Sequence, residues 1–385
     1  MSSTLNTYGK AITTDKRVWK ATTNNVNAVQ MRMALFTDTN YSATAIADVM
    51  HEPDIGTTDE FSFNLSPMIK PVFDFSFLDL AAATPISLQT YPVAFAFFEV
   101  ESDGTQILSA GDIDTIHNIT PDIFEFNAFS LTTYDCGDTG SASRKFLTSA
   151  PSPVDLGVGE SFFLTVSQWT LDVSDNSKQE LVIEKYDSTG SLTGTVTQTL
   201  LRQTITINTV TRYYALNSTH RIGLTASDSY LLCYVRDISG GTVRSEIFRF
   251  NQVSRCDKVL RFHWLNEFGG QDSYTFEGAI KKAIGSESET YTKVRPVNPL
   301  TSDAGELTFA NMYNYEWEVY TANETKTNID WISKMLRTNK VAVEIDGLYY
   351  PIVLNTKALN IYDEMGVVTN LGLKFRFANE NMGIQ

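Results

Sequence analysis

Histidine offers the first test for metal or acid–base chemistry, because imidazole is a frequent metal ligand and the usual general base near neutral pH. The chain holds four, His51, His117, His220 and His263. None has a second histidine four residues away, as a helical zinc motif requires. His263 lies in an apolar segment beside Trp264, where a hydrogen-bonded structural role is the usual one. We therefore predict no metal site and no cofactor.

Carboxylates leave one enzymatic alternative open. Glycosidases need only two carboxyl groups around the scissile bond, and Asp112, Asp114, Asp122 and Glu125 lie close in sequence. An acidic chain produces such clusters freely, and loop carboxylates are usually solvated. Nucleophile-elbow, phosphate-loop and dinucleotide-binding motifs do not occur in the sequence. A polysaccharide hydrolase stays open as an alternative, but we predict a non-enzymatic protein without catalytic residues.

Charge and cysteine content restrict the partners. The net charge is −15, and phosphate neutralisation supplies most non-specific nucleic-acid affinity. We predict no specific nucleic-acid binding, although an acidic channel would let DNA slide through without sticking. Cys136, Cys233 and Cys256 form no CxxC pair, which favours thiols in a protein made in a reducing cytoplasm. No apolar run approaches the ~18 residues of a membrane span, so we predict no membrane insertion.

Length and composition predict a mainly β, multidomain protein. A chain of 385 residues exceeds the size at which single cores stop growing, and its 23 Phe and 17 Tyr suit pleated, half-buried strands. We predict three blocks: a β-rich domain over residues 1–150, a β-sandwich over 151–255, and a third domain over 256–385. The first boundary is placed at residues 148–153, a small-residue and proline stretch that resists regular structure.

The first two blocks are predicted from strand-like segments and turn residues. The first block has strand-like segments at residues 61–65, 72–80 and 93–100, and a pattern that favours a short helix at 44–50. In the second block, short strands recur at the regular spacing typical of an immunoglobulin- or fibronectin-like sandwich, without the cysteine and tryptophan marks of antibody domains. These strands are predicted at residues 162–166, 181–186, 204–208, 222–224, 230–235 and 246–250.

The third block combines one helix with long alternating strands. A helix is predicted at residues 328–337, capped by Thr327 or Asn328, with apolar residues at helical spacing facing a sheet. The residues expected at this helix–sheet contact are Ile329, Trp331, Ile332, Met335 and Leu336.

A hairpin and a closing strand follow this helix. Strands Val341–Ile345 and Leu348–Leu354 flank Asp346-Gly347, a pair that suits a two-residue type I′ turn. Residues 371–377 alternate apolar and polar side chains, which predicts a strand with one buried face.

A long polar segment interrupts the strands at the start of the third block. Strands are predicted at residues 260–266, 273–280 and 306–320, and residues 281–299 between the last two are polar, charged and closed by prolines. This segment is too long and hydrophilic for a tight turn. We predict that it forms a protruding arm.

Two stretches carry a resemblance to a known class of proteins. Residues 261–276, with the core Phe-x-x-Leu-Asn-x-x-Gly-Gly, and residues 347–354 to 375–380 resemble structural proteins of tailed bacteriophages that infect Bacteroidetes-type bacteria. The order of strand, long loop, strands, single helix and terminal hairpin is similar to the tail-tube fold of tube, distal-tail and baseplate-hub subunits. The resemblance covers residues 256–380 well and the preceding sandwich loosely.

This resemblance implies a tail, neck or baseplate protein of the virion, made in the host cytoplasm. The domain would be one sector of a homo-oligomeric ring, commonly hexameric, that forms part of a DNA conduit or its attachment platform and contacts other tail or neck proteins. Open sheet edges also favour a ring, because the edge strands of neighbouring subunits pair with one another when the ring closes. In tail-tube folds the long loop reaches a neighbouring ring, and residues 282–298 match it. Tyr291, Lys293 and Arg295 are therefore the interface candidates, against the alternative of a solvated loop.

A second function stays open on the same particle. A host-surface binding protein that recognises a glycan or receptor would present exposed aromatic residues, for which Trp19, Trp169, Tyr213 and Tyr214 are candidates. Aromatic residues in strands are more often core residues or cross-strand pairs.

Overall fold

The structure is a computed structural model, and every structural statement below refers to the residues that it describes. These are residues 5–6, 18–22, 27–36, 47–54, 60–64, 86–87, 90–117, 131–137, 142–168, 179–200, 202–207, 210–215, 217–256, 258–292, 306–338, 340–356 and 370–378.

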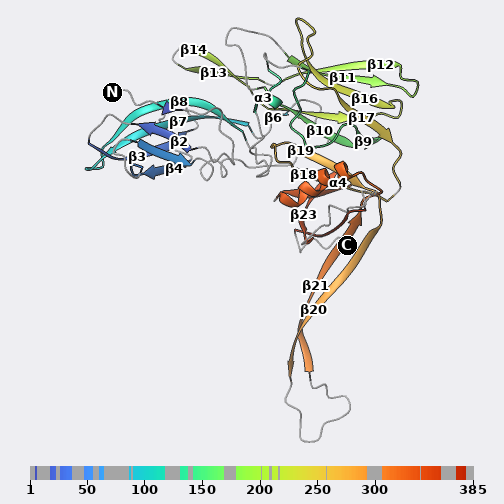
Figure 1. Cartoon of the computed structure of the whole chain (residues 1–385). Helices are drawn as coiled ribbons and strands as arrows, with labels where there is room; N and C mark the ends of the chain where they lie inside the picture. The colour runs from blue at the N-terminus through green and yellow to red at the C-terminus, as the bar shows by residue number, and fades with distance from the viewer. Residues whose placement is uncertain are drawn as a thin grey trace, which may run out of the picture. The chain divides into compact units, whose positions relative to one another are not determined.

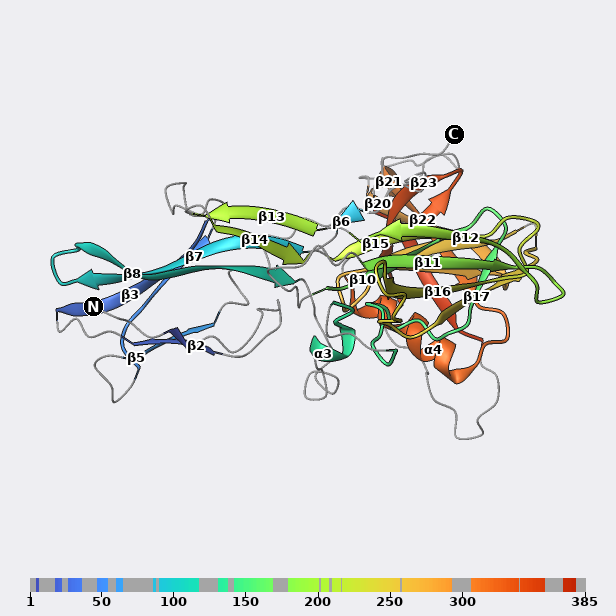
Figure 2. The same ribbon diagram turned by 90° about the horizontal axis from the view of Figure 1, so that it is seen from above.

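The protein is mainly β and multidomain, which confirms the predicted fold class (Figures 1 and 2). The chain divides into two compact units. The first unit contains Met1–Ser254 and Leu265–Asp272, and the second contains Arg255–Trp264 and Ser273–Gln385. The division into three blocks, with a further boundary near residue 150, stays a prediction.

A four-stranded antiparallel sheet in the order β4-β3-β7-β8 dominates the N-terminal part of the first unit. Its strands are β3 (Ala28–Phe36), β4 (Ala47–His51), β7 (Thr90–Glu101) and β8 (Gln106–His117). A smaller sheet is formed by β1 (Leu5–Asn6), β2 (Val18–Thr22) and β5 (Glu60–Asn64). The predicted segments 61–65 and 93–100 overlap β5 and β7, whereas 72–80 lies outside the described residues.

The predicted helix at residues 44–50 is wrong, because β4 occupies most of this segment. Met50 pairs with Arg32 of β3, and the guanidinium of Arg32 lies 2.8 Å from the carboxylate of Asp48 on the neighbouring strand. Local composition favours a helix here, but pairing with a strand more than ten residues away satisfies the backbone and decides the outcome.

In the rest of the first unit, two sheets pack face to face. One has the order β12-β11-β16-β17-β9 and the other β10-β15-β6. The ring centroids of Phe162 on β10 and Phe250 on β17 are 5.3 Å apart, which places the core between the sheets. The strands are β6 (Ile86–Ser87), β9 (Val154–Gly157), β10 (Ser161–Val166), β11 (Gln179–Tyr186), β12 (Leu192–Thr199), β15 (Ser218–Gly223), β16 (Tyr230–Asp237) and β17 (Phe248–Val253).

Three strands of this region were not predicted. They are β9, β12 and β14 (Val210–Ala215), the last of which pairs only with β13 (Arg202–Ile207) among the described strands. β9 has only four residues and β12 is rich in threonine, so neither periodicity nor apolar content distinguishes these two strands from loops. β6 also joins this part of the chain, because Ser87 and Ile86 pair with Ser218 and Thr219 of β15.

The second unit contains a seven-stranded sheet in the order β19-β18-β22-β23-β24-β21-β20. Phe262, Trp264, Phe276 and Phe375 are fully or almost fully buried and form its core. The strands are β18 (Leu260–Leu265), β19 (Gln271–Phe276), β20 (Ile280–Thr292), β21 (Glu306–Tyr320), β22 (Val341–Ile345), β23 (Leu348–Leu354) and β24 (Gly372–Phe377).

The terminal hairpin has the predicted bounds. Asp346 and Gly347 both have positive φ, 52° and 75°, as a two-residue type I′ turn requires. The closing strand is β24, in which Leu373 and Phe375 are buried and Lys374 between them is exposed.

The single helix of this unit, α4 (Lys326–Ser333), begins two residues before its predicted start. Neither Thr327 nor Asn328 is its cap. Thr325 has extended backbone angles, and its hydroxyl accepts a hydrogen bond from the backbone N–H of Asn328. The predicted cap was wrong because it was placed next to the first apolar residue, whereas the first turn of α4 is polar.

The helix continues as a 3-10 turn, η2 (Lys334–Arg337). Ile329, Ile332 and Met335 are fully buried and Trp331 is 4% exposed, whereas Leu336 is only partly buried. The tighter winding of a 3-10 turn rotates successive side chains by about 120°. This rotation keeps Met335 on the buried face and moves Leu336 toward its margin.

The predicted loop at residues 281–299 is wrong over its first twelve residues, because 281–292 belong to β20. β20 pairs with β21 along its whole length, from Ile280–Val319 to Thr292–Glu306. The predicted strand 273–280 is in fact β19 followed by a break and the first residue of β20. A strand that is exposed on both faces carries polar side chains on both, so its sequence looks like that of a loop.

Candidate assembly surface

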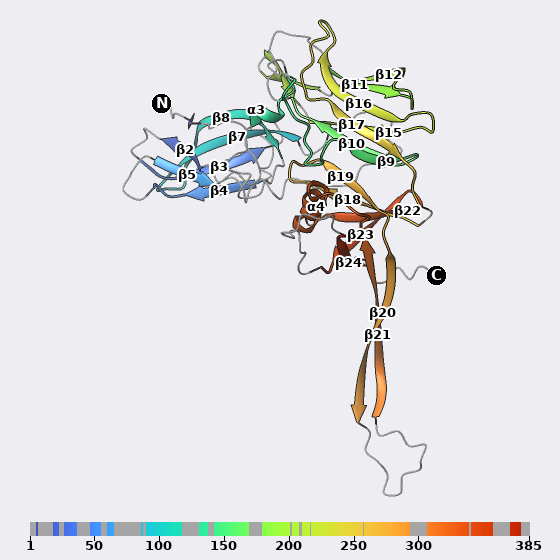
Figure 3. The same ribbon diagram turned by 45° about the vertical axis from the view of Figure 1, so that its right-hand side comes forward.

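The β20–β21 hairpin extends beyond the strands that support it. β24 pairs with β21 only from Trp317 to Tyr320, and β20 has no partner but β21 among the described strands. We call residues 283–292 and 306–316 the arm. Figures 1 and 3 show it as a two-stranded ribbon that projects from the sheet of its own unit.

Apolar side chains are exposed at both ends of the arm. Ile284 is 64% exposed and pairs with Tyr315, which is 39% exposed. Tyr291, one of the interface candidates, lies on β20 opposite Leu307 and is 49% exposed. The other two candidates, Lys293 and Arg295, lie outside the described residues. The described part of the candidate interface is therefore Tyr291.

Cation–π contacts stabilise the root of the arm, by which we mean the residues around Lys282 and Trp317 where the hairpin leaves the sheet. The ammonium of Lys282 lies 4.3 Å from the ring centroid of Tyr315 and 5.0 Å from that of Trp317. Trp317 in turn lies 6.2 Å from Phe375 of β24, with the rings nearly parallel. Such contacts contribute about 0.5–1 kcal/mol each at exposed sites. They connect the first residues of β20 to β21 and, through Trp317, to β24.

A second lysine strengthens the root. Lys281 donates a hydrogen bond of 3.2 Å to the hydroxyl of Tyr320, and its ammonium lies 3.7 Å from the carboxylate of Glu318. The bond to Tyr320, with the nearby charge of Glu318, raises the pKa of Lys281 above its usual value, so the lysine stays charged.

A buried Ser–His–Glu network lies elsewhere in the second unit. His263 Nδ1 is 2.7 Å from the hydroxyl of Ser273, and His263 Nε2 is 2.9 Å from a carboxylate oxygen of Glu344. In some enzymes a serine, a histidine and a glutamate serve as nucleophile, general base and orienting carboxylate. Ser273 is 2% exposed and His263 is 0% exposed, so a substrate has no approach to the hydroxyl. The network joins β18, β19 and β22.

The remaining chemical candidates do not come together among the described residues. Asp112 and Asp114 lie two positions apart on β8, opposite Phe95 and Val93, whereas Asp122 and Glu125 lie outside the described part. No group of three metal-ligating side chains occurs in the described ranges. Burial raises the pKa of the Cys136 and Cys233 thiols, and Cys256 is exposed.

A set of tyrosines covers the outer face of the five-stranded sheet in the first unit. We call Glu184, Tyr186, Tyr230, Tyr234 and Arg249 the tyrosine face. Along β16 the partly exposed residues of this face alternate with fully buried ones that point into the sandwich. Sequence analysis missed this face because it depends on which side of each strand faces outward.

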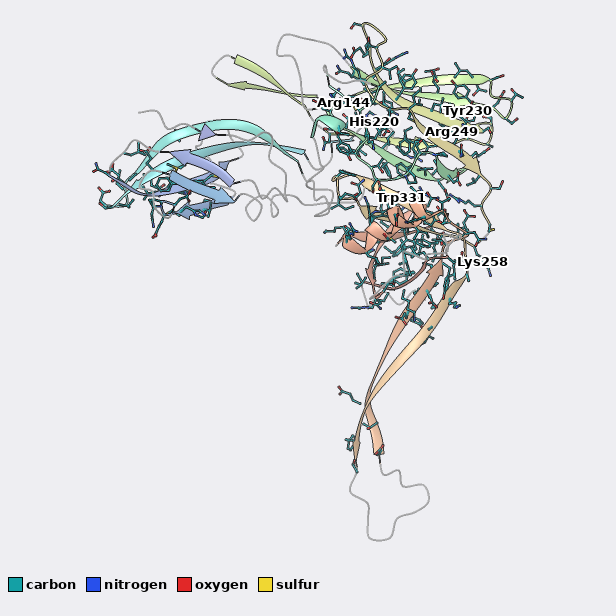
Figure 4. All side chains as sticks on the ribbon, in the orientation of Figure 1. Arg144, His220, Tyr230, Arg249, Lys258 and Trp331 are labelled. Atoms are coloured by element: carbon teal, nitrogen blue, oxygen red, sulfur yellow. The ribbon has the colours of Figure 1, made fainter. Side chains whose placement is uncertain are left out.

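The members of the tyrosine face hold one another in place. Tyr186 and Tyr230 stack with ring centroids 4.7 Å apart, and the guanidinium of Arg249 lies 4.2 Å from the ring centroid of Tyr230. Figure 4 labels Tyr230 and Arg249. The hydroxyls of Tyr186 and Tyr234 both donate to the carboxylate of Glu184, at 2.8 and 2.9 Å. The bond to Glu184 raises the pKa of Tyr186 to about 12, so its hydroxyl remains protonated at neutral pH.

The aromatic candidates named for surface recognition are elsewhere. Trp19 lies on β2 opposite Phe63, and Tyr213 and Tyr214 lie on β14 opposite Thr204 and Gln203. Trp169 lies outside the described residues.

Comparison with known proteins gives no family. No family model matches the chain, and no curated protein matches its sequence. Among solved structures, trypsin-activated alpha-2-macroglobulin from Escherichia coli aligns at 8% identity and a TM-score of 0.19, over 84% of this chain and 19% of that protein. The extracellular region of plexin A4 aligns at 7% identity and a TM-score of 0.18, over 96% of this chain and 38% of that protein.

These likenesses carry no argument about fold or function, because their TM-scores are far below 0.5. The chain spans well under two thirds of the length of either protein. Among the described residues, no helix has both the length and the apolar character needed to cross a membrane.

Proposed function

We propose that this protein is a non-enzymatic virion structural protein that self-assembles as a ring subunit of a phage tail, neck or baseplate. It forms part of the DNA conduit or of its attachment platform. The observation that carries the proposal is the hairpin that bears the arm: β20 and β21, of 13 and 15 residues, pair with each other, and among the described strands they pair with the rest of the sheet only at Trp317–Tyr320.

An isolated two-stranded ribbon is at most marginally stable in water. The outer edge of β20, and that of β21 beyond Trp317, pair with no described strand. Exposed Ile284 and Tyr315 add apolar surface that water does not favour. A neighbouring subunit or ring that covers the arm would pair its edges and bury these side chains.

The sequence resemblance supports the same assignment. The Phe-x-x-Leu-Asn-x-x-Gly-Gly core lies in β18 and the turn before β19, and residues 347–354 contain β23. These strands belong to the same seven-stranded sheet as the arm. The net charge of −15 suits a conduit whose wall repels passing DNA. The partners are further copies of the chain, in a ring that we expect to be hexameric, and other tail or neck proteins.

Shortening the arm tests this function. Deleting residues 285–288 together with 311–314 removes four paired positions from each strand, from Gly285–Asn314 to Ser288–Asn311. Because the number is even, the remaining residues keep their register and their faces. We expect an unchanged circular dichroism spectrum with loss of the rings that the intact chain forms in negative-stain electron microscopy. Normal rings from the shortened chain would refute the role of the arm, and compact particles without a lumen from the intact chain would refute the function.

The tyrosine face favours a second candidate, a host-surface binding protein that recognises a glycan or receptor. Tyr and Arg are the residues most enriched at binding hot spots, and here they are held in place before any ligand arrives. Replacing Tyr230 by Ala would remove the stacking partner of both Tyr186 and Arg249. Binding to host cells that is lost in this variant, in a protein that forms no rings, would favour the second candidate over the first.

A further inference from the structure

The first unit has a sheet edge that no described strand covers. β12 is the terminal strand of the five-stranded sheet, and β11 is its only partner among the described strands. Six of its eight residues are exposed and the other two are partly exposed. Leu192 and Val196 are 54% and 41% exposed. The unpaired N–H and C=O groups along such an edge are satisfied by water or by another strand.

β12 lacks the features that normally prevent an edge from pairing. Its sequence, Leu-Thr-Gly-Thr-Val-Thr-Gln-Thr, contains no charged residue and no proline. The only irregularity of its pairing lies near the turn, between Lys185 and Tyr186 of β11, so the positions from Gly194 to Thr199 are regular. Proteins usually protect long edges with lysine, proline, a bulge or a short strand.

Two other terminal strands differ in this respect. The opposite edge of the same sheet is β9, which has only four residues and an exposed aspartate, Asp155. β20, one of the two terminal strands of the sheet in the second unit, carries Lys281 and Lys282 directly after its first residue, Ile280. β12 is therefore the long, uncharged edge among them, and it is exposed in a folded unit.

We propose that the β12 edge is a self-association site, where β12 of a second copy of this chain pairs with it in antiparallel orientation. The strand has no charge, so it neither repels its own copy nor selects a charged partner. Two-fold pairing places threonines near threonines and buries Val196, and cross-strand pairs of this kind stabilise a sheet. The five-stranded sheet then continues across the two copies. This contact is independent of the arm, which lies in the second unit.

Cysteine scanning tests this geometry in the full-length chain. The background carries Cys256→Ser, because Cys136 and Cys233 are buried. Single cysteines are then placed at positions 193, 195, 196 and 197, with Val158→Cys as a control at an exposed valine in a turn. In a two-fold antiparallel pair, each step along the strand from the axis separates the two copies of a residue by about 7 Å more. Disulfides need Cα atoms within about 7 Å.

We expect the yield of disulfide-linked dimer to peak at one position of β12 and to fall about fivefold or more two positions away. Val158→Cys should give only the small yield of dimer that results from random collisions between molecules. Yields that are equal along β12, or equal to that of the control, would overturn the proposal. Rings that assemble through the arm alone give such a flat profile, so a failure here is distinguishable from a failure of the proposed function.

A charge swap gives an independent test. Val196→Lys and Val196→Glu each place like charges near the two-fold axis and should weaken self-association through β12 about fivefold or more. A mixture of the two variants should restore association through β12, because the introduced lysine of one copy would then face the introduced glutamate of the other. The readout is cross-linking through a cysteine at whichever of positions 193, 195 and 197 gave the highest yield in the scan, with circular dichroism as a check on folding. Unchanged cross-linking in the single variants, or no recovery in the mixture, would count against the pairing.

Discussion

The indole of Trp331 on α4 lies 5.5 Å from that of Trp264 on β18, with the ring planes tilted by 46°. The ring of Tyr274 on β19 contacts the indole of Trp331 at nearly a right angle, with the ring centroids 5.9 Å apart. Trp264 is fully buried and Trp331 is 4% exposed. Figure 4 labels Trp331 on the helix. This contact attaches α4 to the edge of the seven-stranded sheet that is formed by β18 and β19.

Replacing Ile332 by Ala tests the buried face of the helix. Ile332 is 0% exposed, and truncating a buried isoleucine costs about 2–5 kcal/mol of unfolding free energy, because the transfer energy is lost and a cavity remains. Denaturant unfolding followed by tryptophan fluorescence measures the change. Thr327→Ala, at an exposed position of the same helix, should change stability by less than about 0.5 kcal/mol. Equal effects of the two substitutions would mean that the helix buries another face.

Replacing Gly278 by Ala should destabilise the root of the arm. A Cβ atom at Gly278 would lie 2.5 Å from the backbone oxygen of Tyr320 and 2.7 Å from that of Thr321. The oxygen of Tyr320 accepts the backbone hydrogen bond of Gly278, and backbone atoms cannot rotate away as a side chain can, so we expect a loss of about 1–3 kcal/mol. Gly194→Ala on β12 is the control, because nothing lies within 4 Å of its Cβ position. Thermal unfolding of the two variants compares them directly.

Burial of His220 predicts a specific pH dependence. Its Nδ1 lies 2.7 Å from Gln198, its Nε2 has no hydrogen-bond partner among the described residues, and burial lowers its pKa to about 3. Below pH 6.5 the unfolded chain binds a proton at this residue that the folded chain does not. The unfolding free energy therefore falls as the pH drops from about 6.5 toward 3, by up to about 1.4 kcal/mol per pH unit.

The variant His220→Gln isolates this contribution. The carboxylates titrate alike in both proteins, so the difference between their stabilities should change with pH between 6.5 and 4.5. His51→Gln, at a partly exposed position, is the control. Stability curves of the wild type and His220→Gln that stay parallel over this range would show that His220 is not neutral in the folded protein.

The exposed apolar side chain at the root of the arm should matter for assembly and not for folding. Ile284→Glu places a charge at a position that is 64% exposed, so we expect a stability change below about 0.5 kcal/mol. If a neighbouring subunit covers this position, a buried unpaired charge should abolish ring formation. Ile247→Glu is the control, since Ile247 is 57% exposed in the first unit. Ring counts by electron microscopy and the unfolding midpoint separate the two effects.

The sequence alone determined the features that depend on neighbouring residues. Asp346-Gly347 between two alternating strands was sufficient to place the last hairpin, because a type I′ turn requires positive φ at both positions. The apolar spacing of Ile329, Ile332 and Met335 identified the buried face of the helix, because helical periodicity is local. Only the polar first turn concealed where this helix begins.

Only the tertiary structure decided the features that depend on distant partners. β4 is a strand because β3 pairs with it, and residues 281–292 are a strand because β21 returns alongside them. The network of Ser273, His263 and Glu344 joins residues up to 81 positions apart, and no sequence spacing indicates it. β12 is an edge only because of the strand order of its sheet. Backbone pairing between distant segments leaves little trace in side-chain periodicity when both faces of a strand are exposed, as in β12 and at residues 281–284 and 289–292 of β20.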